Sequence, residues 1–286
     1  AEAGKNLVPV TLELGGKNPV IVDVDTDVAK AAKIIADARM VNGGQVCLCP
    51  DYVFVPEGKV GEFTDKVIER WTQNYPTVLT NNQYTSTINN KNYERIVGLI
   101  DDAVDLGATK RQVIPAGEDL PDALARKIPP TLLTGVKAGM KIEEDEVFGP
   151  VLTVYPYREL GEAIDKINSA GHPLTLYWIG NDNDRLKRVA DNTRSGSISG
   201  NDFALHLFSH GLPFGGVGRS GMGNYRGKFG FDTFSHARAV TVSSMPISVA
   251  EMMSAPFTSR DAKLFDSQVN MFRRFLKGSI RKNAKR

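Results

Sequence analysis

Glu13 opens the first of three short segments in which a reactive side chain stands beside glycines. It ends an apolar, strand-like run, and Gly15 and Gly16 follow it, which allows a sharp turn and close approach by another group. Partial burial at this place would raise the pKa of the Glu13 carboxyl towards that of a general base. Taken alone, the segment is more typical of an exposed carboxylate at a strand end.

Cys47 follows a second glycine pair, Gly43 and Gly44, where a helix is expected to stop. A thiol on such a turn could act as an accessible nucleophile, activated by backbone amides or by a nearby charge. An isolated cysteine is more often a small buried hydrophobic residue, so the spacing alone favours packing over catalysis. We expect no metal, because Cys47 and Cys49 alternate across a strand and no His or second Cys pair stands at ligand spacing.

Glu146 and Phe148 belong to the third segment, an acidic run that starts at Glu143 and ends in Gly149-Pro150. A solvated acidic loop is the ordinary interpretation of such a run. It is weakened here because Phe148 leads straight into the apolar run 151–154, which is expected to be a buried strand.

A further segment, 216–221, reads Gly-x-Gly-x-x-Gly. A dinucleotide fingerprint needs a strand before these glycines, a helix that opens at them and an acidic residue about 20 positions later. Residues 212–215 are a poor strand and residues 222–225 a poor helix start, so we predict a loop and not a phosphate cradle.

Strand-like and helix-like runs alternate around these segments, which predicts an α/β domain with a mostly parallel sheet. Strand-like sequence begins at 7–12, and further strands are expected at 18–23, 51–55, 112–115, 131–133, 151–157 and 174–179. Helices are expected from Thr26 or Asp27 to 41, then at about 60–71, 93–104, 160–169, 182–191 and 264–276. The glycine-rich stretch 195–230 is expected to be an ordered loop of the kind that often carries function.

Composition excludes several classes of protein. Of the 286 residues, 41% are hydrophobic and 24% are charged, which is typical of a globular protein. The 35 basic and 33 acidic residues are too nearly balanced for a nucleic-acid surface. No apolar run approaches the roughly 18 residues that cross a bilayer, and no secretory signal pattern is expected at the N-terminus. The two cysteines fit a reducing compartment, so we expect a cytoplasmic protein.

The basic residues are unevenly placed. Seven of them, and no acidic residue, fall in the last fourteen positions, which leaves 28 basic against 33 acidic residues in the rest of the chain. This tail could make a weak contact with an anionic membrane surface, although a solvated tail is the more ordinary interpretation.

Taken together, the segments resemble the aldehyde dehydrogenase superfamily. The run from Glu13 to Lys17 is similar to its general-base motif, and Gln45-Val-Cys47, with Asn42 before it, to its nucleophile motif. The run Glu146-Val-Phe-Gly-Pro resembles its cofactor-ribose motif. Residues 47–53 and the glycine-rich run 212–236 resemble the branch of coniferyl aldehyde and class 3 (fatty and aromatic) aldehyde dehydrogenases. The resemblance extends to about residue 242.

The resemblance implies a reaction, namely NAD- or NADP-dependent oxidation of an aldehyde, such as coniferyl aldehyde, to the acid. Cys47 would be the nucleophile that forms a thiohemiacetal and then a thioester, and Glu13 would activate the water that hydrolyses the thioester. Glu146 would accept hydrogen bonds from the nicotinamide-side ribose, with Phe148 beside the cofactor. Cys49 is expected only to pack, and Lys17 and Asn18 to be structural.

The resemblance also implies a domain organisation. In the family the dinucleotide-binding domain lies mostly before the general-base motif, so here we expect it to be largely absent. Residues 1–15 would be its remnant, 16–242 the aldehyde dehydrogenase catalytic domain and 243–286 a basic C-terminal extension. The chain alone would then have little or no activity, and its apolar residues from Leu7 to Leu14 would be uncovered. A homo-oligomer and a small-molecule aldehyde substrate are implied.

Two alternatives stay open. Coenzyme A could replace water as the acyl acceptor, although a water-activating Glu13 argues against this. The chain could also be a non-catalytic fragment or assembly module, in which case the Cys47 thiol would be inert at neutral pH.

Overall fold

The computed structural model describes residues 1–244, 246, 248–252, 254, 255, 259, 262, 263, 266, 267, 269–271, 273 and 274. The chain divides into two units, Ala1–Ser235 and His236–Arg286. The first unit holds all the segments that could do chemistry. Helix α10 (Val249–Met252) belongs to the second. Of the helix expected over 264–276, the described residues 266, 267, 269–271, 273 and 274 are helical, while the basic tail after 274 lies outside the described residues and stays a prediction.

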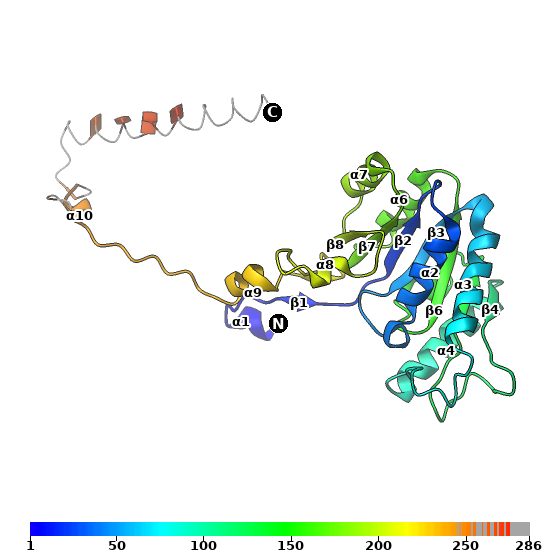
Figure 1. Ribbon diagram of the computed structural model, residues 1–286. Helices are drawn as coiled ribbons and strands as arrows, with labels where there is room; N and C mark the ends of the chain where they lie inside the picture. Colours follow the sequence, from blue (N-terminus) through cyan, green and yellow to red (C-terminus); the bar gives the residue numbers. More distant parts are fainter. Residues whose placement is uncertain are drawn as a thin grey trace. The chain divides into compact units, whose positions relative to one another are not determined.

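A seven-stranded sheet forms the centre of the first unit, in the order β4-β5-β6-β3-β2-β7-β8 (Figure 1). Every neighbouring pair is parallel except β4 and β5. The mostly parallel α/β sheet predicted from the sequence is therefore confirmed. Its strands are β2 (Asn18–Val22), β3 (Pro50–Pro56), β4 (Thr109–Gln112), β5 (Thr131–Thr134), β6 (Val151–Tyr157), β7 (Thr175–Ile179) and β8 (Ser197–Gly200).

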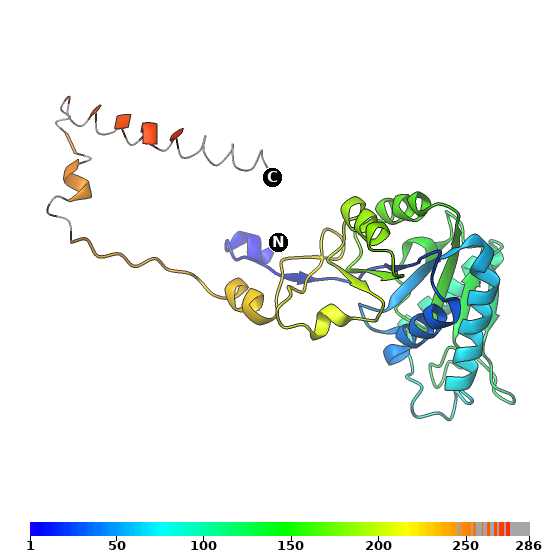
Figure 2. The same cartoon turned by 45° about the horizontal axis from the view of Figure 1, so that its top comes forward.

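Helices cover both faces of this sheet because successive strand side chains point to opposite sides. Val20 and Val22 pack with α2 (Val28–Arg39) and α3 (Val60–Asn74), which lie side by side across one face (Figure 2). Ile21, between those two valines, packs instead with α6 (Leu160–Ser169) and α7 (Asn183–Asn192). Helix α4 (Asn90–Asp105) packs in a third cluster with residues of β5 and β6. Short helices complete the unit: α1 (Glu2–Lys5), η1 (Val41–Gly44), η2 (Glu57–Lys59), α5 (Lys141–Glu144), α8 (Leu205–Phe208) and α9 (Gly227–Thr233).

A second, two-stranded sheet pairs β1 (Leu12–Glu13) with β9 (Gly221–Met222) and lies apart from the large sheet in Figure 1. The apolar side chains on this side of the unit are exposed, as the sequence predicts; they are Leu7, Val8, Val10, Leu12 and Leu14.

Three expectations about local structure need correction. The strand-like run 7–12 contributes only Leu12 to a strand, because β1 has a single two-residue partner. The strand expected at 112–115 lies at Thr109–Gln112, where polar side chains pair antiparallel with β5. Pro115 lacks the N–H that a ladder needs, so the pairing ends before it. The glycine-rich stretch also contains the unexpected edge strand β8 and two short helices.

Within the described residues, no helix combines the length and the apolar character needed to cross a membrane.

Candidate active site

Cys47 lies on the turn between α2 and β3. Asp27 caps the start of α2 by accepting hydrogen bonds from two backbone N–H groups, and the helix ends at Arg39. Residues 42–44 then take left-handed backbone angles, with φ of 50°, 63° and 77°, which confirms the expected helix break. A Cβ atom on Gly44 would overlap the carbonyl oxygen of Gly149. Glycine is needed there because the cysteine turn packs directly on the segment that carries Glu146.

Asn18 holds the backbone on both sides of the thiol. Its side-chain amide donates to the carbonyl oxygens of Cys47 at 2.7 Å and Cys49 at 3.1 Å. Its side-chain oxygen accepts the N–H of Thr175 at 3.0 Å, and the residue is fully buried. The sequence suggested a structural role for Asn18, but only the parallel packing of β2, β3 and β7 shows that the role concerns the Cys47 turn.

The two thiols have different surroundings. Cys47 is half-buried, and its pKa is raised first by burial and then by the negative charges of Glu13 and Glu146. Its own backbone N–H acts in the opposite direction. Cys49 is 3% exposed, and burial raises its pKa to about 11. The buried position of Cys49 agrees with the packing role expected for it.

Glu13 is placed by the glycine-rich loop. It pairs with Gly221, where a Cβ atom would overlap the carbonyl oxygen of Leu12. The Gly-x-Gly-x-x-Gly letters of 216–221 therefore form a turn that leads into β9, and the predicted loop is confirmed. The Glu13 side chain is exposed, not partly buried as its apolar strand suggested, because β1 pairs only with the two-residue strand β9. Desolvation still raises the pKa of the carboxyl.

Glu146 lies in the segment between α5 and β6, against the Gly15–Gly16 turn. A Cβ atom on Gly15 would overlap its carboxylate, and the N–H of Gly16 donates a hydrogen bond to it. Burial, followed by the charge of Asp51, raises the pKa of Glu146 to about 7. Phe148, two residues on, is half-buried and has a left-handed φ of 50°.

The carboxylate of Glu146 suits a ligand that presents hydroxyl groups. It lines a hollow of about 260 Å³ together with Gly15, Gly16 and Lys17. A carboxylate has about four acceptor positions, and the N–H of Gly16 fills one. The absence of a side chain on Gly15 lets the carboxylate lie directly against the backbone, and the remaining acceptors border the hollow. A ribose with two adjacent hydroxyls fits this donor and acceptor arrangement.

The structure thus brings Glu13 and Glu146 within electrostatic reach of Cys47, and it adds Tyr225. Burial and the charges of Glu13 and Cys47 raise the pKa of Tyr225. Its ring meets Phe214 edge to face, with centroids 5.5 Å apart. The sequence did not single out Tyr225; the only signal was an aromatic residue in a glycine-rich loop.

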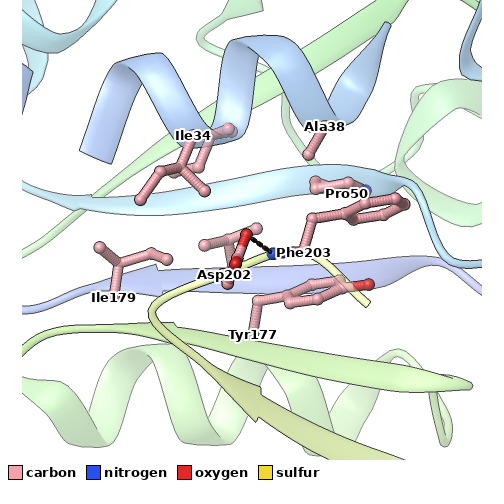
Figure 3. Close-up of a pocket in the computed structure, with 9 residues that line it drawn as sticks. Ile34, Ala38, Pro50, Tyr177, Ile179, Asp202 and Phe203 are labelled. Atoms are coloured by element: carbon pink, nitrogen blue, oxygen red, sulfur yellow. Dashed lines mark hydrogen bonds between the residues drawn. The ribbon is translucent and has the colours of Figure 1, made fainter. Parts of the chain in front are cut away.

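Apolar side chains surround the thiol. A buried cluster of Leu48, Leu174, Ala204 and Phe214 packs with Cys47, Val46, Phe203, Leu207 and Tyr225. Phe203 also lines a narrow apolar pocket between α2 and the strands β2 and β7, where its ring stacks on Tyr177 (Figure 3). The wall beside Cys47 is therefore continuous with the face of α2.

Among the described residues, no group of three or more His, Cys, Asp and Glu side chains is arranged to hold a metal ion.

Residues 1–240 match the model of a family described as the aldehyde dehydrogenase family. A probable coniferyl aldehyde dehydrogenase of Caulobacter vibrioides is 44% identical over 83% of this chain and 49% of its own length. The coniferyl aldehyde dehydrogenase of a Pseudomonas species is 43% identical over 89% of this chain and 53% of its own length. Aldehyde dehydrogenase family 3 member A2 of Mus musculus is 36% identical over 97% of this chain and 55% of its own length. The chain thus spans about half the length of the curated relatives it matches.

Solved structures with similar folds lead to the same family. Substrate-bound AldH of Staphylococcus aureus superimposes with a TM-score of 0.80 and 33% identity, covering 93% of this chain and 56% of that one. An NADP-dependent glyceraldehyde-3-phosphate dehydrogenase of Bacillus halodurans, complexed with NADP, superimposes with a TM-score of 0.72 and 28% identity, covering 83% of this chain and 50% of that one.

Proposed function

The chain belongs to the aldehyde dehydrogenase family, and from this membership we propose that its residues serve the NAD(P)-dependent oxidation of an aldehyde to a carboxylic acid. The observation that supports the proposal is the electrostatic contact of one thiol, Cys47, with the carboxylates of Glu13 and Glu146. These residues come from segments far apart in the sequence and have the chemical types that a nucleophile, a base and a hydroxyl acceptor need.

Cys47 is the proposed nucleophile. Because its pKa is raised, the group is mostly a neutral thiol near pH 7, and it reacts through the thiolate that remains when the half-buried thiol gives its proton to solvent. The thiolate sulfur then bonds to the aldehyde carbon, and the carbonyl oxygen becomes the oxyanion of a thiohemiacetal. The backbone N–H of Cys47 is the proposed donor to that oxygen.

Glu13 serves the second half of the reaction, since desolvation raises its pKa and makes it a better proton acceptor. When bound, NAD or NADP supplies the hydride acceptor by which the thiohemiacetal becomes a thioester. Glu13 takes a proton from water, and the water oxygen bonds to the thioester carbon. The carbon–sulfur bond then breaks, which releases the acid and frees Cys47. Glu146 accepts hydrogen bonds from ribose hydroxyls, and Phe148 lies beside the bound nucleotide.

The substrate class proposed is an apolar or aromatic aldehyde. Two relatives with 44% and 43% identity carry coniferyl aldehyde in their names, and apolar and aromatic side chains surround Cys47. We further propose that the chain forms a homo-oligomer in the cytoplasm and that it divides into three parts, 1–15, 16–242 and 243–286.

An activated ester tests the nucleophile and the base without any cofactor. With p-nitrophenyl acetate, the chain should release nitrophenolate in a burst and carry an acetyl group on Cys47, found by mass spectrometry. Cys47→Ser should abolish the burst, and Cys49→Ser is the matched control that should keep it. Glu13→Gln should keep the burst and slow the later turnover about 100-fold, the usual contribution of a general base.

Acetylation of Cys49 alone, or a burst that survives in Cys47→Ser, would overturn the proposal. An inert thiol would favour the non-catalytic module.

A further inference from the structure

Asp51 is a buried carboxylate that the proposed chemistry does not use. It lies in β3, four residues after Cys47, and its side chain is 1% exposed. One oxygen accepts a hydrogen bond from the Lys17 ammonium at 3.0 Å, and the other accepts the backbone N–H of Val147 at 3.0 Å. Lys17 directly follows the Gly15–Gly16 turn, and Val147 directly follows Glu146. A single side chain therefore ties together the segments of all three chemical groups.

Cations hold the same loop from other sides. Lys17 also donates to the carbonyl oxygen of Asp145 at 3.0 Å. Arg95, on α4, donates to the carbonyl oxygens of Glu146 at 3.0 Å and Val147 at 2.6 Å. The buried Arg39, at the end of α2, donates to the carbonyl oxygen of Gly149. The backbone that carries Glu146 and Phe148 is thus fixed by side chains from several elements.

Asp51 accepts hydrogen bonds in this arrangement, and it is the charged partner of the Lys17 ammonium group. The Lys17 side chain is only 9% exposed. A buried charge without its partner is strongly unfavourable, so loss of Asp51 would drive Lys17 away from the loop. A carboxylate needed only to neutralise Lys17 would not have to place its second oxygen on the N–H beside Glu146.

We propose that Asp51 is a positioning residue: it fixes the Glu146–Phe148 backbone against the Gly15–Lys17 segment and so sets where the Glu146 carboxylate stands. The cofactor part of this inference rests on the function proposed for Glu146. The positioning itself is a property of this chain and can be measured without any ligand.

Two variants of Asp51 separate its two contacts. Asp51→Asn keeps an oxygen that can accept the Val147 N–H but loses the ion pair with Lys17. Asp51→Ala loses both contacts. Asp65→Asn is the matched control, because Asp65 also forms an ion pair, with Arg111 at 2.7 Å, on an exposed part of α3.

The first measurement is hydrogen exchange of the Val147 amide, which reports the hydrogen bond directly. Asp51→Ala should speed this exchange about tenfold or more relative to amides of β2, the effect of losing one buried hydrogen bond. Asp51→Asn should speed it less, and Asp65→Asn not at all. Unchanged exchange at Val147 in Asp51→Ala, or an equal increase over the whole sheet, would overturn the inference. If Asp51→Ala does not fold, Asp51→Asn is judged against Asp65→Asn by the same criterion.

The second measurement is a carbon-13 NMR titration of the Glu146 carboxyl. The charge of Asp51 raises the pKa of Glu146 by more than the charge of Lys17 lowers it, so Asp51→Asn should lower this pKa even if Lys17 moves away. An unchanged titration would show that Asp51 acts only on general stability and would contradict the positioning role. Failure of the proposed function has a different signature: Glu146→Gln would leave the dissociation constant for NAD and NADP unchanged while both Asp51 effects persist.

Discussion

Gly15 and Glu146 lie in direct contact, although 130 positions separate them in the sequence: a Cβ atom on Gly15 would overlap the Glu146 carboxylate. The segment from Glu13 to Lys17 therefore packs against the Glu146 loop so closely that it has no room for one methyl group on Gly15. The space above Gly15 belongs to the carboxylate.

Gly15→Ala should therefore displace the Glu146 carboxylate. The methyl group would push it away from the Gly16 N–H towards solvent, and the loss of burial, which is the main cause of its raised pKa, should bring that pKa down from about 7. A carbon-13 titration of Glu146 measures the change. Gly98→Ala is the control, since a Cβ atom there meets nothing within 4 Å. A titration midpoint that stays near 7 in Gly15→Ala would contradict the contact.

Glu13→Gln and Glu146→Gln should each make Cys47 more reactive at neutral pH. Both carboxylates raise the pKa of the thiol by their charge, so their removal lowers it and increases the thiolate fraction. The rate of iodoacetamide alkylation against pH should therefore shift to lower pH, with a several-fold faster rate at pH 7. A Cys49→Ser background leaves Cys47 as the only thiol. Superimposable pH profiles for the parent and both variants would disprove the electrostatic coupling.

Asn18→Ala should destabilise the chain severely. It leaves the carbonyl oxygens of Cys47 and Cys49 and the N–H of Thr175 without their partner in a fully buried site. With about 1–3 kcal/mol for each unsatisfied group and partial relaxation, the free energy of unfolding should fall by about 3 kcal/mol in urea denaturation. Asn168→Ala, which removes one exposed hydrogen bond to Asn192, should change it by less than about 1 kcal/mol. An equal loss of unfolding free energy in the two variants would contradict the role of Asn18 in satisfying three buried backbone groups.

The stability of the chain should depend on pH through Glu146. Burial raises its pKa from 4.5 to about 7 in the folded state. Below pH 4.5 the group is protonated in both states, and as the pH rises through this interval the unfolded chain loses its proton first. The folded state therefore loses stability between pH 4.5 and 7, by at most about 3 kcal/mol.

Glu146→Gln removes this dependence. The free energy of unfolding of the variant minus that of the parent, from urea titrations at several pH values, should rise from pH 4.5 to 7 and then level off. A difference that is constant over this range would show that Glu146 does not titrate there.

Local patterns predicted the parts of the fold that depend on local interactions. Helix α6 begins and ends where its apolar spacing predicts, and β6 coincides with its apolar run, because burial of each is decided by its own residues. Strand β4 was misplaced because its residues, Thr109–Gln112, are polar and their pairing depends on β5.

The site was predictable to a different degree. The glycine spacing correctly placed Glu13 at the end of a strand and Cys47 after a helix break. The contacts of Asn18 with Cys47 and of Asp51 with Val147 join distant segments. Periodicity and local composition do not predict such pairs, because the pairs form only when the parallel strands take their final order in the sheet.

The contact of Gly44 with Gly149 has an evolutionary consequence. Backbone meets backbone there, so no exchange of side chains can widen or shorten the spacing between the cysteine turn and the Glu146 loop. The aromatic wall formed by Phe203, Phe214 and Tyr225, by contrast, consists of side chains that can be replaced one at a time. The surface proposed to receive the aldehyde can therefore change by single substitutions, while the spacing between the Cys47 turn and the Glu146 loop is set by the backbone.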